Sequence, residues 1–188
     1  MRELDPKEVA RRLTAGRARA ERMAGQSARR PASGELRRAI ERAEAALALV
    51  TTDVEATTAI REPGKILRYG DWILEGARDP RSWLLDNGDP EGNDELLADD
   101  DDELACQFGG YTFLLHGDQS TAEMAVDIAY QVQDDVTHEV WAAWPRCPGH
   151  PHPMSPAIAG GTAVWTCPSD SDVTRPIGQL PARPTGSP

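Results

Sequence analysis

Two runs of sequence decide the fold of the C-terminal part of the chain: Trp144-Pro-Arg-Cys-Pro-Gly-His-Pro-His-Pro153 and Ala163-Val-Trp-Thr-Cys-Pro-Ser-Asp170. They contain Cys147-x2-His150 and, sixteen residues later, Cys167-x2-Asp170. A gap of two residues within each pair lets a tight turn direct both side chains toward one metal ion, as in zinc ribbons. The spacing therefore predicts a ribbon-like module over residues 145–180.

The ligands predicted from this spacing are Cys147, His150, Cys167 and Asp170, and the cofactor is a structural zinc ion. His152 is an alternative that can replace either Asp170 or His150, because carboxylate is an uncommon ligand in structural zinc sites. Two other interpretations stay open. The module can fold without metal, held by its tryptophans, or Cys147 and Cys167 can form a disulfide.

The same residues carry a resemblance. The run from Trp144 to Pro153, followed by Val164-Trp-Thr-Cys-Pro168, resembles a segment of small uncharacterised actinobacterial proteins and, more loosely, zinc ribbons. This resemblance implies a ribbon-like module in a bacterial protein and implies no particular activity.

Composition limits the classes of protein to consider. The chain has 188 residues with 39% hydrophobic content, enough for one domain or two small ones. Residues 1–68 carry 15 Lys and Arg against 10 Asp and Glu, whereas residues 69–188 carry 5 against 21. An acidic body repels a nucleic-acid backbone. No apolar run approaches the length of a membrane span, so we expect no membrane partner and a cytoplasmic location.

Residues 1–62 are predicted to form a basic helical hairpin. A first helix begins at Asp5-Pro6, and Pro31 and Gly34 interrupt it. A second begins near Ser33 or Gly34 and carries apolar residues at heptad spacing. These residues are Leu36, Ile40, Ala43, Leu47, Val50 and Val54. The stripe either packs on the rest of the domain or serves self-association.

The remaining segments complete a predicted α+β protein. Residues 63–104 form a mixed segment and an acidic loop, and residues 105–144 form a hairpin with a Gly109-Gly110 turn and then an amphipathic helix. Ser120 and Glu123 predict a capping box for this helix, which is expected to end at Trp144 because Pro145 follows. Residues 181–188 are expected to be a disordered tail.

No catalytic constellation is evident, so the chain is predicted not to be an enzyme. The leading hypothesis is an interaction or assembly protein that engages a protein partner, or itself, through the helical seams. The first alternative is a nucleic-acid-associated protein that uses a group of arginines on the first helix. That group is Arg11, Arg12, Arg17, Arg19 and Arg22. The second alternative, a zinc hydrolase, requires a metal with an open coordination position.

Overall fold

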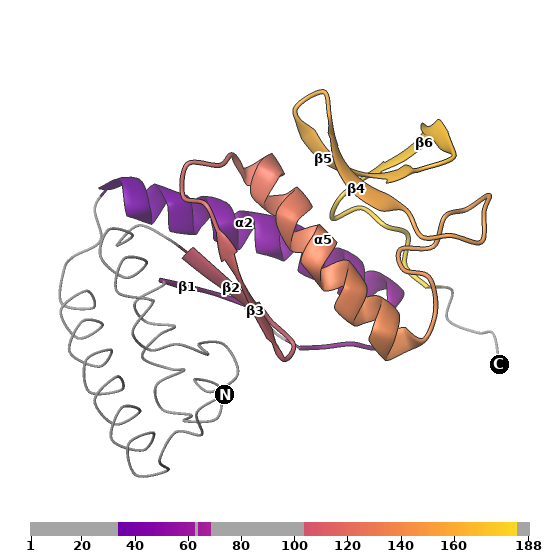
Figure 1. Ribbon diagram of the computed structural model, residues 1–188, viewed down its shortest axis with the longest axis horizontal. Coiled ribbons are helices and arrows are strands. Elements are labelled where there is room, and N and C mark those ends of the chain that lie inside the picture. Colours follow the sequence, from indigo (N-terminus) through magenta and orange to yellow (C-terminus); the bar gives the residue numbers. More distant parts are fainter. Residues whose placement is uncertain (1–33, 63, 69–103, 184–188) are drawn as a thin grey trace, which may run out of the picture. The chain divides into compact units, whose positions relative to one another are not determined.

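The computed structural model describes residues 34–62, 64–68 and 104–183, and within them the chain forms two helices and two three-stranded sheets (Figure 1). This arrangement confirms the predicted α+β class. Of these residues, 34–62, 64–66 and 104–183 belong to one compact unit. The first helix of the predicted hairpin, the acidic loop and residues 184–188 lie outside the described residues.

Helix α2, Gly34–Thr57, begins where the sequence predicts and buries its heptad stripe except for Ile40, which is partly exposed. Leu47 is 6% exposed and Val50 is fully buried. The helix packs against α5, Thr121–Val140, which carries a buried apolar stripe of its own. The apolar seam of α2, which could otherwise serve self-association, is therefore covered within this chain by α5.

Helix α5 starts with the predicted capping box. The Ser120 hydroxyl accepts a hydrogen bond from the Glu123 N–H at 3.3 Å, and the Glu123 carboxylate accepts one from the Ser120 N–H at 2.7 Å. The predicted end at Trp144 is wrong, because the helix stops at Val140. Trp141 adopts a left-handed conformation with φ 52° and ψ 35°. This conformation ends the helix at Val140, before the chain reaches Pro145.

The first sheet contains β1 (Lys65–Arg68), β2 (Leu104–Phe108) and β3 (Tyr111–Leu115) in that order. Strands β2 and β3 are antiparallel, with Phe108 opposite Tyr111 across the Gly109-Gly110 turn. Gly109 has φ +57°, a conformation that glycine adopts without steric cost. The predicted hairpin is confirmed.

The second sheet contains β4 (Ser155–Ala159), β5 (Thr162–Cys167) and β6 (Asp170–Pro176), with both pairs antiparallel. Gly160 and Gly161 both have positive φ, which suits the two-residue turn that joins β4 to β5. Strands β4 and β5 pack against α5. In Figure 1 the two sheets are drawn on different sides of this helix.

The segment after β6 runs back to α2. The Ile177 N–H donates to the Ala163 carbonyl at 3.0 Å, and the Arg183 N–H donates to the Ala56 carbonyl at 2.9 Å. Residues of the predicted tail that are described, 181–183, are thus attached to α2. Neither of the described helices is long and apolar enough to cross a membrane.

Candidate metal centre

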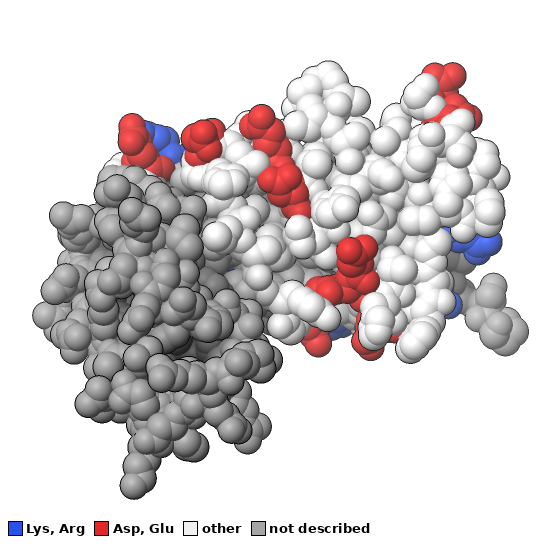
Figure 2. Space-filling model, viewed as in Figure 1, with Lys and Arg blue, Asp and Glu red and all other residues white. Residues whose placement is uncertain are grey.

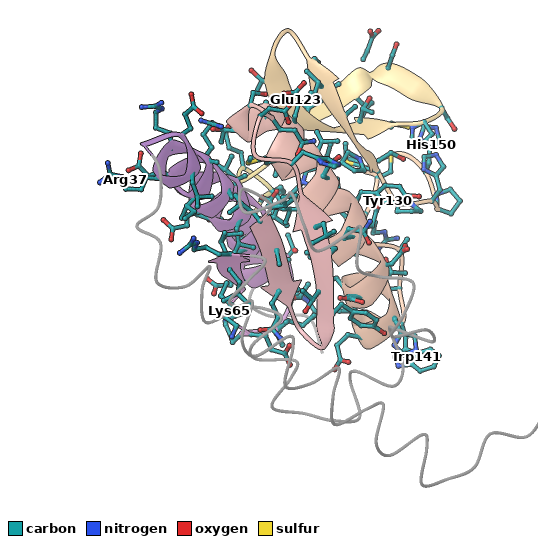
Figure 3. The ribbon with its side chains drawn as sticks, turned by 60° about the vertical axis from the view of Figure 1, so that its left-hand side comes forward. Arg37, Lys65, Glu123, Tyr130, Trp141 and His150 are labelled. Carbon is teal, nitrogen blue, oxygen red and sulfur yellow. The ribbon has the colours of Figure 1, made fainter. Side chains whose placement is uncertain are left out.

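Four side chains with atoms that can bind a metal lie close together beside the second sheet. They belong to Cys147, His150, His152 and Cys167, and their ligand atoms all lie within 4.8 Å of one another. Both cysteines are buried, and both histidines are partly exposed. Figure 3 shows His150 on the loop beside the β4–β6 sheet. The structure therefore brings the two cysteine positions of the predicted ribbon to one point.

The distances inside the cluster suit a tetrahedral ion. The Nδ1 atom of His150 lies 3.4 Å from the Cys147 sulfur and 3.2 Å from the Cys167 sulfur. The Nε2 atom of His152 lies 3.9 Å from the Cys167 sulfur. A zinc ion with Zn–S near 2.3 Å and Zn–N near 2.0 Å separates sulfur and nitrogen by about 3.5 Å at the tetrahedral angle. The observed separations scatter around that value.

The loop that carries three of these residues is closed on itself. The Met154 N–H donates to the Pro145 carbonyl at 2.8 Å, and the Cys147 N–H donates to the His152 carbonyl at 3.4 Å. Several residues of the loop precede prolines, which restricts them to extended conformations and lowers the entropy lost on ordering. The loop can therefore present its ligands without regular secondary structure.

The fourth residue of the cluster, Cys167, stands at the end of β5. Its sulfur accepts a hydrogen bond from the backbone N–H of Ser169 at 3.4 Å. A donor of this kind stabilises the negative charge of a thiolate. The turn after β5 thus directs a backbone donor at this sulfur.

The ring of His152 is oriented by its neighbours. Its Nδ1 atom lies 2.8 Å from the Pro153 carbonyl oxygen, which can only accept, so this nitrogen carries the proton. The other nitrogen, Nε2, faces Cys167 and the Ser169 hydroxyl, 3.1 Å away. In a metal-binding histidine, one ring nitrogen usually donates its N–H to a carbonyl oxygen or carboxylate, and the other nitrogen offers its lone pair to the metal.

Asp170, the first choice for the fourth ligand, is not in this group. It is exposed at the start of β6, and its Oδ1 atom accepts a hydrogen bond from the Asp172 N–H at 3.1 Å. This local turn holds the carboxylate at the solvent face. His152, the alternative, lies in the cluster instead. The donor set is thus two thiols and two imidazoles, which zinc commonly accepts.

A buried carboxylate links the C-terminal module, residues 145–180, to α2. Asp53 is completely buried, and its Oδ2 atom accepts hydrogen bonds from Trp165 Nε1 and the Gly178 N–H, each at 2.7 Å. Its Oδ1 atom accepts a third from the Leu180 N–H at 2.8 Å. Three donors satisfy a charge that would otherwise be costly to bury. Because Trp165 lies two residues before Cys167, Asp53 fixes the strand that delivers this ligand.

Two further side chains, Trp144 and Gln133, position the loop that carries the other three residues of the cluster. Trp144 Nε1 donates to the Thr57 hydroxyl at 2.8 Å, and the Trp144 ring meets Trp165 edge to face at 5.3 Å. From α5, Gln133 Nε2 donates to the carbonyls of Trp144 and Met154 at 2.8 and 2.6 Å. Gln133 therefore bridges the two ends of the loop that contains Cys147, His150 and His152.

Sequence reasoning missed Asp53 and Gln133. A signal for Asp53 exists, because this acid lies beside Val54 and three residues after Val50, on the flank of the apolar stripe. Gln133 has no comparable signal, since a glutamine on an amphipathic helix is ordinary.

The third cysteine lies elsewhere. Cys106 is fully buried in β2, and desolvation by burial raises the pKa of its thiol to about 12. A thiol with this pKa is protonated at neutral pH, so Cys106 is unsuited to metal binding.

The arginines of the nucleic-acid alternative, Arg11 to Arg22, lie outside the described residues. On the face shown in Figure 2, the charged atoms of the described residues are mostly acidic. Comparisons with protein families, with curated proteins and with solved structures find no match for this chain.

Proposed function

We propose that this chain is a non-enzymatic interaction protein whose ribbon-like C-terminal module is held by a structural zinc ion. The ligands are Cys147, His150, His152 and Cys167. The observation that carries the proposal is the convergence of their four ligand atoms within 4.8 Å. Four protein ligands fill a tetrahedral zinc site and leave no position for a reacting water, which favours a structural ion over a hydrolytic one.

Exposed aromatic side chains support the interaction role. Trp141 at the end of α5 is 86% exposed, and Tyr130 on the same helix is 61% exposed. Trp141 is held against His138, with ring centroids 5.5 Å apart. Rigid, exposed tryptophan and tyrosine are the side chains most enriched at the energetic centres of protein interfaces. A partner would thus engage these residues, whereas Leu47 and Val50 of the α2 seam are already covered.

A bacterial cytoplasmic location is part of the proposal, because cysteines stay reduced in reducing compartments and form disulfides in oxidising ones. The protein would then gain its module fold from the metal rather than from a disulfide.

Elemental analysis of the purified full-length chain tests the metal. We expect one zinc per chain in the wild type and loss of that zinc in both Cys147→Ser and Cys167→Ser. The matched control is Cys106→Ala, which removes the buried thiol outside the cluster and is expected to keep its zinc. A wild-type protein that takes up no zinc under reducing conditions, or a Cys167→Ser variant that keeps the full amount, contradicts the proposal.

A further inference from the structure

The two sulfur atoms of the cluster lie within 4.8 Å of each other. We propose that Cys147 and Cys167 form a redox modification site, in which hydrogen peroxide joins the two thiolates in a disulfide and so releases the zinc. The release step rests on the proposed function, whereas the pairing of the two thiols does not.

The geometry brings the sulfurs within reach of each other. They are at most 4.8 Å apart, and the same His150 nitrogen lies 3.4 Å from one and 3.2 Å from the other. A disulfide bond is about 2.05 Å long, so the sulfurs must approach by less than about 2.8 Å. Cys147 stands in an irregular loop, where small backbone shifts and side-chain rotation can supply this movement.

The loop forms an open pocket whose lining includes Cys147 and His150 but not Cys167. Arg146 is also part of the lining. Cys147 itself is only 2% exposed, so peroxide reaches its sulfur through movement of this loop. We therefore assign the first attack to Cys147, which borders the pocket, and completion of the disulfide to Cys167.

The reaction balances without a further reagent. The Cys147 thiolate attacks one peroxide oxygen, the O–O bond breaks, and the departing hydroxide takes a proton from solvent to become water. The Cys167 thiolate then attacks the sulfenic acid sulfur, and the S–O bond breaks to release a second hydroxide, which is also protonated to water. Two thiolates lose two electrons, and one peroxide gains them. A disulfide is a poor zinc ligand, so two histidines alone are left to hold the ion.

Cys106 does not compete in this reaction. It is fully buried in β2, and the raised pKa of its thiol, about 12, keeps it protonated. Only the thiolate reacts readily with peroxide. The chain thus contains an internal control for the selectivity of the site.

The module is expected to remain docked when it is oxidised. The hydrogen bonds from Trp165 to Asp53 and from Trp144 to Thr57 do not involve the cluster, and neither does the bridge made by Gln133. The change is therefore confined to the ligand loop, where both histidine rings lose their metal.

The test uses the zinc-loaded, fully reduced wild-type chain, titrated with hydrogen peroxide after the reductant has been removed. Released zinc is measured with a chromogenic chelator, free thiols are counted in denaturant, and peptide mapping locates the bond. We expect one zinc released per disulfide, a fall from the three thiols of the sequence to one, and a Cys147–Cys167 cross-link. Dithiothreitol is expected to restore zinc binding.

Two variants sharpen the result. Cys106→Ala is expected to release zinc with the same peroxide dependence and to end with no free thiol. Cys167→Ser, oxidised in the presence of dimedone, is expected to show the adduct on Cys147. Zinc retained with three free thiols at excess peroxide overturns the inference, as does a cross-link through Cys106. A chain that takes up no zinc overturns the proposed function instead, and mapping of the metal-free protein still tests the cysteine pair.

Discussion

Replacing Asp53 with alanine removes the acceptor for three hydrogen bonds at once. The donors that lose their partner are Trp165 Nε1 and the backbone N–H groups of Gly178 and Leu180. Trp165 is fully buried, whereas Gly178 and Leu180 are partly exposed and can recruit water.

A buried donor left without an acceptor costs about 1–3 kcal/mol, so we assign about 2 kcal/mol to the indole and about 1 kcal/mol to each backbone group. Removing a buried carboxylate also removes its desolvation cost, which offsets part of this sum. The net loss in the free energy of unfolding is expected to be about 3 kcal/mol, a large part of the roughly 5–15 kcal/mol that stabilises a domain. Asp53→Asn keeps one acceptor oxygen and is expected to lose less.

Urea denaturation, followed by tryptophan fluorescence, measures this loss as a shift in midpoint at constant slope. Glu55→Ala is the matched control, because Glu55 is exposed on the same helix and its loss is expected to change stability by less than about 0.5 kcal/mol. If Asp53→Ala unfolds within that margin of the wild type, the link between α2 and the C-terminal module does not work as described.

Three further predictions concern α5 and its N-terminal cap. Gln133→Ala leaves the carbonyls of Trp144 and Met154 without their shared donor, so we expect weaker zinc binding in a chelator competition and a loss of about 1–3 kcal/mol in stability. The control is Gln131→Ala, because Gln131 is exposed on the same helix and its loss is expected to change neither quantity. An equal effect of both variants would contradict the role of Gln133. Ser120→Ala removes the cap hydroxyl and is expected to cost about 1 kcal/mol in thermal unfolding at neutral pH. Hydrogen bonds from the Ser120 backbone and side chain lower the pKa of Glu123 in the folded protein. The ionised Glu123 therefore stabilises the fold at any pH above its pKa in the unfolded chain, about 4.3. This stabilisation is lost as the pH falls through the lower pKa of the folded protein. The difference in melting temperature between the wild type and Glu123→Gln is therefore expected to shrink from pH 6 to pH 3, and a difference that grows would refute this.

Local chemistry made several elements predictable. The turn residues Gly109-Gly110 placed the β2–β3 hairpin, and Ser120 with Glu123 placed the start of α5, because these residues act on backbone groups within a few positions of themselves. The spacing of Cys147-x2-His150 and Cys167 likewise indicated three residues of the cluster, and His152 was the named alternative for the fourth. The end of α5 was not predictable in the same way, since Trp141 takes a left-handed conformation that no local rule for tryptophan favours.

The sequence by itself determined the α+β class, the positions of these local elements and the two cysteines that approach one another. Only the tertiary structure decided that α2 covers its seam with α5, that His152 rather than Asp170 joins the cluster, and that Asp53 is buried. The physical reason is that the covering of α2 and the burial of Asp53 depend on partners far away in the chain, whereas the choice of His152 depends on how the loop after Trp144 folds back on β5. Trp165, for example, lies more than a hundred residues from the carboxylate that accepts its hydrogen bond.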